Sequence, residues 1–157
     1  METLQRIRPK TNNYRSKAAL IISVLFSLLL AYSACKSIFD LELALQEMRN
    51  QAFPLWTSHY LIWLNIVWQG VTALTLVWSF KNHKIRILGS LLNLALWIFY
   101  TTYTELAFLN VFRPRPCACI YFIDGIAWRA AFFTNSILLT LAIILHFINL
   151  KRGGSAK

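Results

Sequence analysis

The stretch AALIISVLFSLLLAYSAC, residues 18–35, is eighteen residues long and contains no charged residue. A helix that crosses the hydrocarbon core of a bilayer needs about 20 predominantly apolar residues, because each residue adds about 1.5 Å to its length. The stretch therefore predicts a membrane-spanning helix. It is long enough to span, and no small-residue cleavage site follows it, so we expect it to remain in the protein and not to act as a cleaved signal peptide.

Three further apolar runs of similar character follow, at about residues 60–80, 87–110 and 130–149. The whole chain shares this composition, since 57% of its 157 residues are hydrophobic and 14% are charged. Ordinary soluble domains contain about 25% charged residues. The sequence predicts an all-α, polytopic membrane protein in which a four-transmembrane-helix bundle occupies residues 18–149 and leaves no room for another domain.

The net charge of +10 comes from basic residues that flank the apolar runs. They form no recognition helix or basic-aromatic sheet, which argues against a nucleic-acid partner and favours contacts with lipid headgroups. Eleven of the 16 Lys and Arg residues lie in the tail 1–17, the turn 81–86 and the tail 150–157. Because the side richer in Lys and Arg is normally cytoplasmic, we expect a bacterial inner (cytoplasmic) membrane protein with both termini in the cytoplasm.

The connection between the first two spans, residues 36–58, contains a short periodic segment. Its apolar residues recur at helical spacing while charged residues fall between them, which predicts a short amphipathic helix lying in the membrane interface. The apolar positions are Leu41, Ala44, Leu45 and Met48.

Small and polar residues mark one side of each predicted span. Because lipid tails are as apolar as leucine, such residues are expected at helix–helix contacts. We therefore predict that these positions face the inside of the bundle. They are Ser23, Ser27, Ala31 and Cys35 in the first span; Asn65, Gln69, Thr72 and Ser79 in the second; Ser90, Asn93, Trp97, Thr101 and Thr104 in the third; and Asn135, Leu139, Ala142, His146 and Asn149 in the fourth.

The amide residues Gln69, Asn93 and Asn135 allow a second interpretation besides helix packing. Polar side chains within a membrane often line a path or a binding site, so these three would line a small polar pocket for a quinone or for protons. Quinone is the one cofactor that this interpretation suggests. The spans place no charged residue at the membrane midplane, which disfavours ion coupling.

Three cysteines are the strongest candidates for chemistry. Cys117 and Cys119 form a Cys-Ala-Cys motif just after the third span, and Cys35 ends the first span on the same predicted outer side. We expect that side to face the periplasm, an oxidising compartment in which disulfides persist. A bridge between residues two apart closes a small ring and is expected to be strained, and strained, exposed disulfides exchange readily.

Basic residues around the motif point to the same chemistry. Arg113, Arg115 and Arg129 would stabilise thiolates and so favour a reactive pair. Cys35 would then serve as a resolving thiol or would cross-link the first span to the loop. A purely structural bridge that stiffens the loop is the alternative. No metal site is predicted, because His59 is the only histidine on that side and zinc spacing is lacking.

Several of these features together resemble one family. The segment 36–40 directly after the first span, the basic turn between the second and third spans, the cysteines at 117–119, the segment 126–128 and Asn135 in the last span carry the resemblance. The sequence is similar over residues 18–148 to the MauE/DoxX-like redox-associated membrane proteins, named after the methylamine utilisation protein MauE. The resemblance implies a four-helix bundle that handles periplasmic disulfides or helps a partner to mature.

These observations lead to one main hypothesis and two alternatives. The main hypothesis is an inner-membrane thiol–disulfide redox protein, a candidate thiol–disulfide oxidoreductase, that exchanges disulfides at the periplasmic face with a thioredoxin-like partner or assists maturation of a client protein. The first alternative is a non-enzymatic accessory or assembly subunit of a larger membrane complex. The second is a subunit that binds a quinone or another small molecule.

Overall fold

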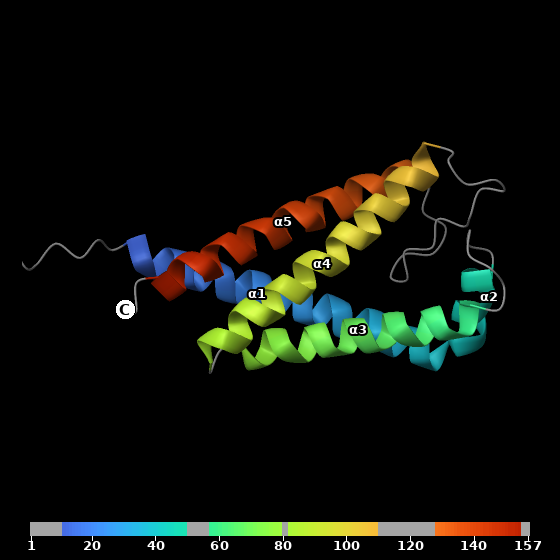
Figure 1. The fold of residues 1–157 in the computed structure, drawn as a ribbon, viewed down its shortest axis with the longest axis horizontal. Helices are drawn as coiled ribbons and strands as arrows, with labels where there is room; N and C mark the ends of the chain where they lie inside the picture. The colour runs from blue at the N-terminus through green and yellow to red at the C-terminus, as the bar shows by residue number, and fades with distance from the viewer. Residues whose placement is uncertain (1–10, 50–56, 80–81, 110–127, 155–157) are drawn as a thin grey trace, which may run out of the picture.

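The structure is a computed structural model that describes residues 11–49, 57–79, 82–109 and 128–154 (Figure 1). The described part of the chain consists almost entirely of α-helices. In chain order the helices are α1 (Thr11–Phe39), α2 (Leu41–Arg49), α3 (Ser58–Trp78), α4 (His83–Phe108) and α5 (Trp128–Gly154).

Four of these helices are long and apolar enough to cross a membrane, which confirms the predicted fold. The first helix continues beyond the predicted span through Lys36 to Phe39, because a single charged side chain does not interrupt backbone hydrogen bonding. The candidate spans are Lys17–Phe39, Ser58–Trp78, Lys84–Phe108 and Arg129–Lys151.

The long helices form two antiparallel pairs, α1 with α3 and α4 with α5 (Figure 1). Contacts between α3 and α4, and between α1 and α5, join the pairs into one bundle. We call the end where α1 begins and α5 ends the terminal end, and the end where α1 and α4 finish the α2 end. In Figure 1 the two pairs lie closest at the terminal end and diverge toward the α2 end.

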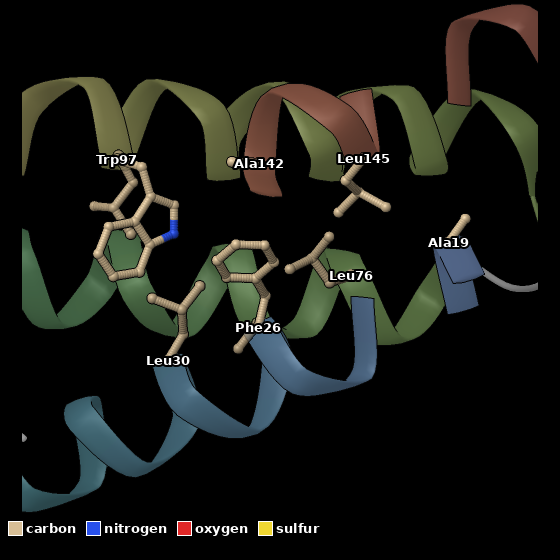
Figure 2. Packing of buried hydrophobic residues seen from close by; sticks show 9 residues of the cluster. Ala19, Phe26, Leu30, Leu76, Trp97, Ala142 and Leu145 are labelled. Carbon is tan, nitrogen blue, oxygen red and sulfur yellow. The ribbon is translucent and has the colours of Figure 1, made fainter. Parts of the chain in front are cut away.

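The largest apolar cluster takes side chains from all four long helices. Phe26 and Leu30 of α1, Leu76 of α3, Trp97 of α4 and Leu145 of α5 pack together (Figure 2). The Phe26 and Trp97 rings lie with centroids 5.9 Å apart. Since lipid supplies no hydrophobic driving force between helices, close packing of this kind is what holds the bundle together.

A glycine sets the distance between α3 and α4. A Cβ atom added to Gly89 would lie 3.1 Å from the carbonyl carbon of Thr75 and 3.3 Å from the amide nitrogen of Leu76. The backbones therefore meet at a position where only glycine fits without a shift, as small residues allow in membrane bundles.

The predicted amphipathic helix is present as α2, and its apolar side rests on α3. Ala44 is buried against Ile62 and Ile66, with Leu41 and Leu45 packed around them. The Met48 side chain lies outside the described residues. The acidic Glu42 points to the exposed side, as the amphipathic pattern requires.

The predicted inward positions of α3, α4 and α5 are buried or half-buried, which confirms them. Of the four positions predicted for α1, two are buried and two are exposed. Ser23 and Ser27 are buried, whereas Ala31 and Cys35 are exposed. A strict spacing of four residues turns about 40° further round the helix at each step, because a helix has about 3.6 residues per turn. Two such steps already leave the contact face, which instead continues through Leu30 to Ser33, Ala34 and Ser37.

Candidate functional site

A cluster of hydrogen-bonded side chains joins α3 to α4 inside the bundle. The Gln69 Nε2 atom donates to the Tyr100 hydroxyl at 2.7 Å and to Asn65 Oδ1 at 3.4 Å. The Tyr100 hydroxyl in turn donates to Asn65 Oδ1. Asn65 and Gln69 lie one turn apart on α3, so both reach the same partner on α4. The helix pair is therefore clamped by polar contacts as well as by packing.

Asn135 makes the corresponding contact between α4 and α5. It is 3% exposed, and its Nδ2 atom donates to Thr104 Oγ1 at 3.4 Å and to the Tyr100 carbonyl oxygen at 3.5 Å. Thr101 donates its hydroxyl to the Asn135 carbonyl oxygen at 3.3 Å. Asn135 thus fastens α5 to the stretch of α4 that also holds α3.

Asn93, the third amide, is buried and accepts a hydrogen bond from its own helix. Its Oδ1 atom accepts a hydrogen bond from Trp97 Nε1 at 3.2 Å. The Trp97 ring packs edge-on against Tyr100, with centroids 5.6 Å apart. Gln69, Asn93 and Asn135 therefore each have their own partners, and these partners lie along one stretch of α4.

Tyr100 was not among the predicted site residues, although it contacts two of the three helices around it. A signal for it exists in the sequence, since it lies three residues after Trp97 and four before Thr104. That spacing continues the contact face of the third span. Tyrosine is also common at membrane surfaces, so residue type alone does not separate the two locations.

His146 contacts α4 near the terminal end. Its Nδ1 atom lies 3.0 Å from the Ser90 hydroxyl, which is also 3.0 Å from the Ile87 carbonyl oxygen. Ser90 is fully buried and His146 half-buried. The contact links α4 to α5, so His146 acts in helix packing here.

Cys35 carries a free thiol on the outer surface of α1, near the α2 end. Tyr32, Ile38 and Phe39 surround it on the helix surface and are 59%, 50% and 86% exposed. The thiol therefore faces away from the bundle interior.

The chain leaves α4 at Leu109 and enters α5 at Trp128, both at the α2 end. That is the end at which α1 presents Cys35. Arg129 is exposed in the first turn of α5. Cys117 and Cys119, with Arg113 and Arg115, lie outside the described residues.

A family model described as methylamine utilisation protein MauE matches residues 15–148. The chain belongs to the MauE family. The match runs through all four spans and the connection that carries the cysteine pair, which confirms the family resemblance. The comparison with curated proteins and the comparison with solved structures each found no match.

The described charges of this MauE-family chain are distributed unevenly between the two ends of the bundle. The acidic residues whose side chains the structure describes lie toward the α2 end, at Asp40, Glu42 and Glu105, together with the basic Lys36, Arg49 and Arg129. The terminal end of the described chain carries only basic charges, which include Lys17, Lys84 and Lys151.

Proposed function

We propose that this MauE-family protein is an inner-membrane thiol–disulfide redox protein. Cys117 and Cys119 exchange disulfides at the periplasmic face with a thioredoxin-like partner or a client protein. The family match supports a redox-associated or accessory role in the membrane. The observation that carries the proposal is that α4 and α5 flank the segment with the cysteine pair at the α2 end, the end at which α1 also presents Cys35 as a candidate resolving thiol.

The charge distribution supports the orientation that this function needs. The side of a membrane protein richer in Lys and Arg is normally cytoplasmic, and the terminal end of the described bundle is the basic one. The α2 end would then face the periplasm, where disulfides persist. Both chain termini would lie in the cytoplasm.

The exchange is balanced without any further oxidant. The Cys117 thiolate attacks one sulfur of a partner disulfide, which forms a mixed disulfide and releases the partner's other sulfur as a thiolate. The Cys119 thiolate then attacks the Cys117 sulfur, forms the Cys117–Cys119 bond and releases the partner's second thiolate. Two electrons pass from this pair to the partner, and the reverse reaction oxidises the partner. Arg113, Arg115 and Arg129 would stabilise the thiolates.

The proposal predicts that Cys119→Ser traps the partner. Because the Cys119 thiolate resolves the mixed disulfide on Cys117 in this exchange, its loss should let an adduct that disappears on reduction accumulate on a non-reducing gel. Cys35→Ser is the matched control, because it removes a cysteine at the same end and keeps the pair. It should show no such adduct if Cys117 and Cys119 suffice.

Two results would count against the exchange. One is a Cys117–Cys119 redox state that never changes, as followed by thiol alkylation, in cells that lack periplasmic thiol oxidases or reductases. The other is full activity of the Cys117→Ser, Cys119→Ser double variant. That second result would support a non-enzymatic accessory or assembly subunit of a larger membrane complex, a role that family membership supports equally.

A further inference from the structure

Three buried polar atoms on α3 and α4 have no hydrogen-bond partner within the described part of the chain. They are Gln69 Oε1, Thr72 Oγ1 and Asn93 Nδ2. Gln69 is 2% exposed, and Thr72 and Asn93 are 0% exposed. Lipid cannot supply hydrogen bonds, so polar groups in the interior of a membrane protein need partners within the protein or from bound water.

The packing of Gly89 places Thr72 and Asn93 at nearly the same depth, with Gln69 one turn away. Gly89 lies against Thr75 and Leu76, and α3 and α4 run antiparallel. Asn93 follows Gly89 by four residues, and Thr72 precedes Leu76 by four, so both lie one turn from this contact and level with each other. Gln69 lies one turn farther along α3, where it binds Tyr100.

Together, the three atoms could hydrogen-bond to one small molecule that both donates and accepts. Gln69 Oε1 accepts, Asn93 Nδ2 donates, and the Thr72 hydroxyl can do either. A buried water typically makes about three hydrogen bonds to groups of this kind. We propose that the bundle binds a single water molecule between Gln69, Thr72 and Asn93, where it bridges α3 and α4.

The packing around the site favours water over a larger guest. One turn away, the two backbones approach so closely that a Cβ on Gly89 would lie 3.1 Å from Thr75. Trp97 and Leu76, at 0% and 1% exposure, fill the neighbouring space. A quinone ring would have to displace these side chains. Asn135 is not part of this site, because it already has partners on α4.

Water-edited solid-state NMR of the ¹⁵N-labelled full chain in lipid bilayers tests the proposal. Magnetisation should pass from water to the Asn93 side-chain amide, whose signal is identified by its loss in Asn93→Leu. Thr72→Val keeps the shape of the side chain but removes the hydroxyl, so it should abolish the transfer. Thr75→Val is the matched control, because its hydroxyl already donates to the Thr72 carbonyl oxygen at 2.9 Å, and it should leave the transfer unchanged.

Absence of transfer to Asn93 in the unmodified protein would overturn the proposal, and this result needs no variant to fold. Equal losses in Thr72→Val and Thr75→Val would overturn it too. Should Thr72→Val not fold, Thr72→Ser retains the hydroxyl and must retain the transfer. Loss of the transfer in Thr72→Ser would likewise contradict a bound water.

Discussion

The single hydroxyl of Tyr100 satisfies two amide side chains on another helix, and its removal should therefore be costly. In Tyr100→Phe, Gln69 would lose its closest acceptor and Asn65 a donor, and lipid can replace neither. Leaving a buried polar group unsatisfied costs about 1–3 kcal/mol. We expect a loss of stability of this order in denaturant unfolding of the protein in detergent micelles.

Tyr32→Phe provides the control for that measurement. It removes the same hydroxyl from a tyrosine that is 59% exposed on α1, so stability should change little. Equal stabilities of Tyr100→Phe and the unmodified protein would show that the hydrogen bonds of Tyr100 do not hold α3 to α4.

At the residue scale, the burial of polar side chains was easier to predict than the side of a helix on which a residue lies. The burial of Gln69, Asn93 and Asn135 follows from the cost of placing an amide in lipid, which depends only on residue type. Cys35 was predicted to face inward and does not, because its direction depends on how far the contact face of α1 turns around the helix. Tyr100 was missed because a tyrosine suits both a membrane surface and a buried hydrogen-bonded site.

At the element scale, the close contact between α3 and α4 requires a glycine at position 89, because glycine has no side chain. Gly89→Ala would place a Cβ 3.1 Å from the Thr75 backbone, and backbone cannot move aside as a flexible side chain can. Overpacking of this kind costs about 1–3 kcal/mol, which should appear in the same unfolding measurement.

Gly70→Ala is the matched control on α3, since nothing lies within 4 Å of a Cβ at that position. Alanine is the better helix former, so this variant should be as stable as the unmodified protein or more stable by about 0.5–1 kcal/mol. If both glycine variants behave alike, the close approach of α3 and α4 does not contribute to stability.

The helices themselves were predictable because each depends on local composition. Apolar length alone indicates a span, and the amphipathic spacing of Leu41, Ala44 and Leu45 indicates α2. The pairing of α1 with α3 and of α4 with α5 could not be predicted. It depends on which small and aromatic side chains fit together across helices, as Gly89 fits Thr75. The periodicity of residues within one helix does not indicate which other helix it packs against.

At the scale of the whole molecule, topology links the fold to the proposed chemistry. Because two spans, α3 and α4, separate α2 from the connection between α4 and α5, both lie at the same end of the bundle. The proposed exchange requires that end to be the periplasmic one, and the larger number of described Lys and Arg residues at the terminal end supports this orientation. The opposite orientation would place Cys117 and Cys119 in a reducing cytoplasm, where a disulfide does not persist.

Single cysteines introduced at the two ends test this orientation in a background where Cys35, Cys117 and Cys119 are serine. Glu42→Cys lies on the exposed side of α2, and Lys84→Cys is exposed at the terminal end. A membrane-impermeant maleimide should label Glu42→Cys in intact cells and Lys84→Cys only after the membrane is permeabilised. The reverse pattern would invert the topology and remove the main argument for disulfide exchange, whereas the packing of the four helices would stand. The labelling therefore separates the proposed function from the fold, because only the function depends on which side of the membrane the α2 end faces.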